Sequence, residues 1–74
     1  MSKTDAAALQ RELCEIMGAL DVLFTLREEF AQWVEEAQSE ERKEELDNVY
    51  RHVDAMEAEY QRRRQEVAKR LAST

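Results

Sequence analysis

Hydrophobic residues recur every three or four positions along two stretches of this sequence. The first series consists of Leu9, Leu13, Ile16, Leu20, Leu23, Phe30, Val34 and Ala37. The second consists of Leu46, Val49, Val53, Met56, Tyr60, Val67 and Leu71. Steps of three and four keep side chains on one face of an α-helix. The pattern therefore predicts two long amphipathic helices, over residues of about 5–38 and about 40–72.

Residues 38–45 separate the two series and contain no apolar side chain. They also contain no glycine or proline, so one continuous helix is the alternative to two. The two series are out of phase, however, because continuing the first beyond Ala37 reaches only polar residues: Glu41, Glu44, Asn48 and Arg51. A continuous helix would carry its hydrophobic stripe on two different faces. We therefore predict an all-α fold, an antiparallel helical hairpin with its turn within residues 37–42.

Local signals support these helix boundaries. Ser39 is a good N-cap residue for the second helix, and Glu40 and Glu41 follow it where acidic side chains stabilise a helix start. Lys69 and Arg70 occupy the last turn, where basic side chains are favourable. Acid–base pairs four residues apart are predicted for Asp47–Arg51, Glu59–Arg63 and Glu66–Arg70. We expect one domain over residues 1–74, frayed at residues 1–4 and 73–74.

The hydrophobic surfaces of the two helices are unequal in width. The stripe of the second helix is narrow, whereas the apolar arc of the first spans about 200°, twice what one covered face needs. Met17 and Phe24 flank the stripe on one side, and Leu26 and Trp33 flank it on the other. A chain of 74 residues also has a marginal core by itself. We therefore predict a partner-binding surface formed by Met17, Val22, Leu23, Phe24, Leu26, Phe30 and Trp33.

The expected partner is a protein, either a second copy that completes a four-helix bundle as a homodimer or a heterologous chain. The formal net charge is −6, so we do not expect nucleic acid as a partner. No apolar run is long enough to span a membrane. Acidic residues near the start argue against a signal peptide, and a single cysteine fits a reducing cytoplasm. The excess of arginine over lysine hints at a bacterial or phage source.

Few residues offer catalytic or metal chemistry. Cys14 and His52 are the only soft metal ligands, too few for a zinc site. We expect Cys14 to be a small packing thiol and His52 a solvated imidazole, and we predict no catalytic residue, metal, cofactor or small-molecule substrate. Gly18 shares the face opposite the hydrophobic stripe with small residues, where it either permits close approach of another backbone or is simply tolerated.

Two basic features need partners. The run Arg62–Arg64 would lie alongside Glu12 and Glu15 in a hairpin, so we expect it to pair internally rather than to contact phosphate. Arg27 interrupts the hydrophobic stripe of the first helix. It either pairs with Asp47 or Asp54 across the hairpin or serves as a polar device that fixes register or partner choice.

The leading functional prediction is a non-enzymatic protein-interaction module. Short acidic helical hairpins occur among secretion co-chaperones, adaptors, small phage inhibitors and dimeric regulators, an analogy of fold that does not choose among them. The alternative is an acidic regulatory decoy that occupies a basic nucleic-acid-binding site on a target. The decoy surface would consist of Asp21, Glu28, Glu29, Glu35 and Glu36.

Overall fold

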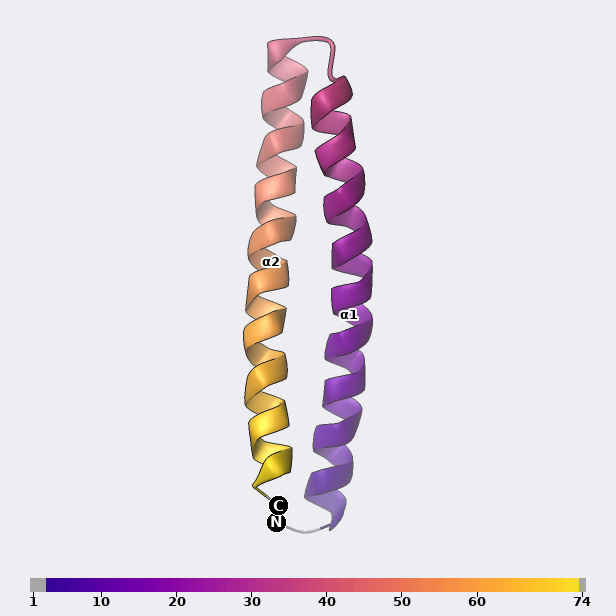
Figure 1. Cartoon of the computed structure of the whole chain (residues 1–74), viewed down its shortest axis with the longest axis vertical. Coiled ribbons are helices and arrows are strands. Elements are labelled where there is room, and N and C mark those ends of the chain that lie inside the picture. Colours follow the sequence, from indigo (N-terminus) through magenta and orange to yellow (C-terminus); the bar gives the residue numbers. More distant parts are fainter. Residues whose placement is uncertain (1–2, 74) are drawn as a thin grey trace.

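The computed structural model describes residues 3–73, which form two long helices joined by a short turn. Helix α1 spans Lys3–Glu36 and helix α2 spans Glu40–Ala72. They run antiparallel, so the start of α1 and the end of α2 lie at the same end of the molecule (Figure 1). The predicted hairpin is confirmed, and the bounds of α2 agree with the sequence. Helix α1 begins at Lys3, two residues before the predicted start, and the fraying expected at residues 1, 2 and 74 falls outside the described range.

The turn is short because Ser39 caps α2 directly. Ser39 adopts extended backbone angles of φ −135° and ψ 153°, and its Oγ accepts a hydrogen bond from the Arg42 backbone N at 3.1 Å. At the end of α1, the Ala37 backbone N donates to the Val34 carbonyl at 3.4 Å. Side-chain capping satisfies one of the otherwise unpaired amides at the start of the helix. The N-cap and the position of the turn are therefore as predicted.

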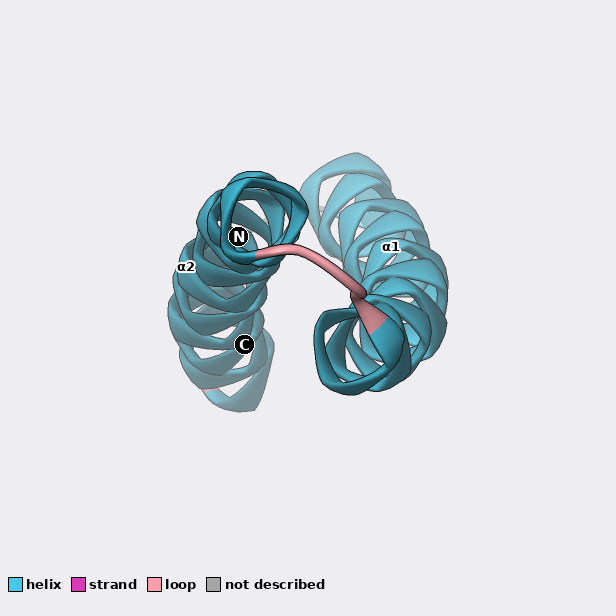
Figure 2. Cartoon of the chain, turned by 90° about the horizontal axis from the view of Figure 1, so that it is seen from above, coloured by secondary structure: helices cyan, strands magenta, loops and turns pink. Residues whose placement is uncertain are grey.

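The core is a single layer of side chains between the helices. Its buried members are Leu9, Ile16, Leu20, Leu23, Val53 and Val67. Leu13, Tyr60 and Leu71 pack against one part of this layer while remaining partly exposed. Viewed along its length, the hairpin shows the two helices crossing rather than running strictly parallel (Figure 2). The alternating steps of four and three in α1 favour such mutual winding, because a seven-residue repeat keeps the contact on one face only if the helices supercoil.

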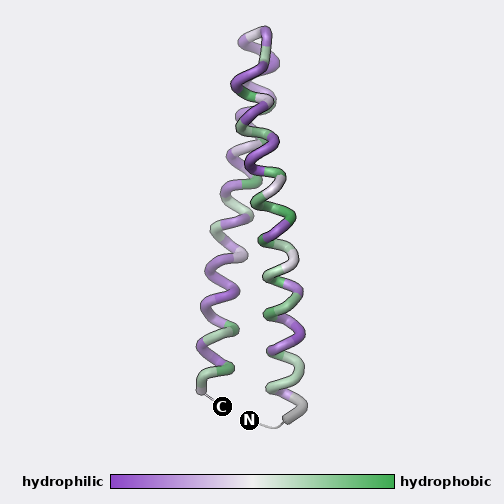
Figure 3. The backbone as a smooth tube through the Cα atoms, turned by 45° about the vertical axis from the view of Figure 1, so that its right-hand side comes forward, coloured by the Kyte–Doolittle hydropathy of each residue, from purple (hydrophilic) through white to green (hydrophobic). Residues whose placement is uncertain are grey.

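Helix α2 is rotated about its axis relative to the sequence expectation. Val49 and Met56 were expected in its buried stripe, yet 42% and 47% of their surfaces are exposed. Tyr50 and Glu57 are partly buried in their place. Both sets have helical spacing, so the interior of the hairpin takes a tyrosine and a carboxylate while two apolar side chains remain outside. Figure 3 shows the consequence for composition, with hydrophobic residues gathered along α1 and α2 mainly hydrophilic.

Neither helix, within the described part of the chain, is long and apolar enough to cross a membrane. The hairpin is a thin rod, and its Cα atoms extend over 56 × 14 × 13 Å.

Candidate protein-docking face

The spacing of the buried residues divides the hairpin into two long sides. Leu26 and Trp33 come just before Arg27 and Val34, two partly buried positions of α1 that face α2, and they flank the contact on one side. Met17 and Phe24 come just after the buried residues Ile16 and Leu23, and they flank the contact on the other side. The sides predicted from the sequence for these four residues therefore agree with the structure.

Hollows at the helix boundary show which part of α2 lies on each side. Trp33 shares a hollow with Arg42 and Leu46. Ala31 shares another with Asp47 and Tyr50. Positions seven residues apart on a supercoiled helix lie on one side. Val49 and Met56 follow Arg42 at that spacing, so they lie on the side of Trp33.

One side of the hairpin thus carries exposed or partly exposed apolar residues contributed by both helices. We call it the tryptophan face and define it as Val22, Leu26 and Trp33 of α1 with Val49 and Met56 of α2. Leu26 is partly buried and the other four are exposed. The two α2 residues were missed by the sequence reasoning, which assigned them to the core. Of the other predicted partner-binding residues, Leu23 is buried against α2 and Phe30 is partly buried.

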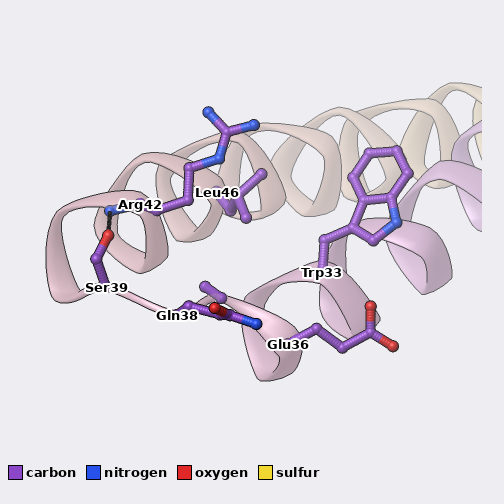
Figure 4. A pocket seen from close by; sticks show the side chains of 7 residues that line it. Trp33, Glu36, Gln38, Ser39, Arg42 and Leu46 are labelled. Atoms are coloured by element: carbon purple, nitrogen blue, oxygen red, sulfur yellow. Dashed lines mark hydrogen bonds between the residues drawn. The ribbon is translucent and has the colours of Figure 1, made fainter.

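Trp33 is held by its neighbour Phe30 on the same helix. The two ring centroids are 4.9 Å apart at an interplanar angle of 71°, an edge-to-face arrangement. The indole borders the hollow at the closed end of the hairpin together with Leu46 and Arg42 of α2 (Figure 4). A rigid aromatic side chain that is fixed on one edge and exposed on the other loses little entropy on contact with a partner.

The opposite side is organised around Arg27. Its Nη1 donates to Glu57 Oε1 at 2.9 Å and lies 3.5 Å from Asp54 Oδ1. Its guanidinium also lies over the Phe24 ring, 5.5 Å from the centroid, a cation–π contact. The other carboxylate oxygen, Glu57 Oε2, is buried without a hydrogen-bond partner among the described residues. Phe24 therefore lies beside a charged cluster, and neither Phe24 nor Met17 is on the tryptophan face.

Arg27 pairs with Asp54 as predicted, but not with Asp47. Helical side chains lean toward the N-terminus of their own helix. In an antiparallel hairpin, Arg27 therefore leans toward the open end, and Glu57 leans toward the closed end to meet it. Asp47 lies on the closed-end side, from which Arg27 leans away, and it pairs instead with Arg51 at 3.0 Å.

The arginine run on α2 pairs within its own helix. Arg62 Nη2 contacts Glu59 at 2.6 Å and Arg62 Nη1 contacts Glu66 at 3.6 Å, while Arg63 contacts Glu59 at 3.4 Å. Arg62 and Arg63 therefore pair internally as predicted, but their partners lie on α2, and no ion pair joins the run to Glu12 or Glu15 in the part of the chain described. The hydrogen bond from Arg62 lowers the pKa of the Glu59 carboxyl and raises that of Arg62 itself. Each partner therefore favours the charged form of the other.

The residues with potential metal chemistry are scattered. Cys14 is exposed rather than packed, which corrects its expected role. His52 is also exposed, as predicted, and it lies on the other helix, roughly 20 Å away along the hairpin. Within residues 3–73, no three His, Cys, Asp or Glu side chains are grouped so that they would hold a metal ion. A Cβ added at Gly18 would meet nothing within 4 Å.

Comparison with known proteins does not add to this description, since no protein-family model, curated protein or solved structure matches the chain.

Proposed function

We propose that this protein is a non-enzymatic interaction module that docks another protein chain on its tryptophan face. The observation that carries the proposal is that Leu26, Trp33, Val49 and Met56, from both helices, gather on one side of the hairpin with three of the four exposed. Scattered exposed apolar residues are normal on protein surfaces, whereas a contiguous patch is typical of a binding site. The docking surface thus differs from the one expected from sequence. It excludes Met17, Leu23, Phe24 and Phe30, and it includes two residues of α2.

The surroundings of this face fit a protein interface. Interface centres are typically enriched in aromatic residues and methionine and depleted of most charged residues, with a polar rim. Here Glu29 and Glu36 of α1 and Arg42 of α2 provide such a rim. The rim carries both signs of charge, which favours a partner with a complementary pattern.

Site-specific photo-crosslinking tests the proposal directly. A photoreactive phenylalanine at Val49 lies on the tryptophan face, and one at Gln32 lies on an exposed surface of α1 that faces away from α2. We expect cells that produce the protein to yield a discrete protein adduct from position 49 and none from position 32. Equal labelling from both positions, or none from either, would contradict the proposal.

Trp33→Ala provides a second measurement once an adduct is identified. Truncating an aromatic that buries about 100 Å² against a partner removes about 2–3 kcal/mol at 25 cal/mol per Å². The dissociation constant should then rise by one or more powers of ten. Helicity should remain near that of the unaltered protein, because only one edge of the Trp33 ring packs against the rest of the hairpin.

The acidic-decoy alternative rests on one observation about α1. Its five proposed acids are all exposed, and Glu28 alone contacts a base within the described residues, at 3.9 Å from Arg27. Such a row of acids is available to a basic target. Salt dependence separates the two proposals, because exposed ion pairs weaken steeply between about 0.1 and 1 M salt whereas apolar docking does not.

A further inference from the structure

We infer that the occupant of the tryptophan face is a second copy of this chain, arranged with α1 of each copy against α2 of the other and both turns at the same end. This inference rests on the proposed function, since it names the partner of the same face. It predicts a two-fold symmetric four-helix bundle.

The first argument is the amount of surface that the hairpin leaves uncovered. Its accessible surface is 5778 Å² for a mass of 8.7 kDa. A compact monomer of that mass exposes about 4,700 Å². The excess of about 1,000 Å² is close to the 800 Å² or so that each partner buries in a standard protein interface. Part of the excess is due to the rod shape of the hairpin, and pairing two rods side by side is the arrangement that removes it.

The second argument is that the face is complementary to itself. Leu26 and Trp33 form one row with a seven-residue spacing on α1, and Val49 and Met56 form a second row with the same spacing on α2. A two-fold axis parallel to the helices places each row against the other row of the partner at the same height. Leu26 of one copy then lies between Met56 and Val49 of the other, as a knob that inserts between side chains of the facing helix.

Charge selects this arrangement over the inverted one. Residues 1–37 carry three basic and eight acidic side chains, whereas residues 38–74 carry eight basic and nine acidic ones. The inverted dimer would place α1 on α1, bringing the acidic rims that contain Glu29 and Glu36 together. The arrangement we infer instead places Glu36 at the height of Arg42 of the second copy. Like charges across an interface are costly, and opposite charges fix its register.

A matched pair of methionine variants tests the interface. Met56→Glu adds a charge on the tryptophan face, and Met17→Glu adds the same charge on the opposite side, at similar exposures of 47% and 53%. Both variants change net charge equally, so general repulsion between copies is the same. In sedimentation equilibrium at micromolar concentration, we expect the unaltered chain and Met17→Glu to have twice the chain mass of 8.7 kDa. The dimer dissociation constant of Met56→Glu should rise about a hundredfold, because a carboxylate enters an apolar contact on both copies.

The possible outcomes separate this inference from the proposed function. A folded monomer of unaltered sequence overturns the inference. A discrete adduct of a different protein at position 49 would then still support the proposed function. A dimer that Met17→Glu dissociates and Met56→Glu leaves intact overturns both, since the interface would then lie on the side of Phe24.

Spin labels at the turn test the arrangement of the dimer. The Gln38→Cys variant, with the exposed Cys14 replaced by serine, carries one label per chain. We expect a label-to-label distance well under half the 56 Å length of the hairpin. A distance comparable with that length would establish the inverted dimer and overturn the arrangement.

Discussion

The ion pair between Arg27 and Glu57 makes a quantitative prediction about stability. Only 27% of the Arg27 side chain and 15% of the Glu57 side chain are exposed. Arg27→Leu would extend the hydrophobic stripe of α1, gaining about 1 kcal/mol of apolar burial. It would also leave the Glu57 carboxylate without a base and beside Asp54. Removing one partner of a fully buried pair costs about 3–5 kcal/mol, and partial exposure reduces this to about 2–3 kcal/mol.

The net result for Arg27→Leu is therefore a loss of about 1–2 kcal/mol. For a domain of this size, that lowers Tm by about 4–16 °C. Glu57→Leu should cost less than 1 kcal/mol, because Arg27 retains Asp54 and partial access to water. The double variant removes both charges and places two leucines between the helices, so we expect it to equal or exceed the unaltered protein in stability.

Urea denaturation followed by circular dichroism measures all four proteins in this cycle, at one fixed protein concentration because association also shifts apparent stability. The diagnostic quantity is the difference between Arg27→Leu and the double variant. If Arg27→Leu alone is as stable as the double variant, the Glu57 carboxylate is not confined by the hairpin and the reasoning fails.

Three further predictions follow from local geometry. Gly18→Ala should stabilise the helix by about 1 kcal/mol, raising Tm by about 4–8 °C, because the added methyl group meets open space; a fall in Tm would reveal a chain packed closely there. Ser39→Ala should cost about 1 kcal/mol in denaturant titration through loss of the cap on α2, and Ser39→Asp should restore it, whereas equal stability of all three would contradict the capping role. The lowered pKa of Glu59 means that its stabilising pair with Arg62 is fully present above the ordinary value of 4.5 and is lost as pH falls through the lowered value. The free energy of unfolding should therefore fall less between neutral and acid pH in Glu59→Gln than in the unaltered protein. An equal fall in both proteins would refute the stabilising role of the Glu59–Arg62 pair.

Much of the hairpin can be predicted from the sequence because its signals are local. The turn follows from a polar gap with a phase break, and the start of α2 follows from Ser39 and the two acids behind it. The face of α1 that packs against α2 follows from its steps of three and four, which only Arg27 interrupts. These features depend on neighbours within a turn or two of helix, so they are present in the order of the residues.

The rotation of α2 about its axis was decided only by tertiary structure. Its sequence contains two stripes of similar spacing, one through Val49 and Met56 and one through Tyr50 and Glu57, and hydrophobicity alone favours the first. The structure places the second stripe inside, where Glu57 supplies the carboxylate that Arg27 requires between the helices. An unpaired guanidinium there would be costly, and this cost opposes the rotation that would bury Val49 and Met56 instead. The same rotation moves Val49 and Met56 outward beside Trp33, and so the composition of the tryptophan face depends on a contact between residues thirty positions apart.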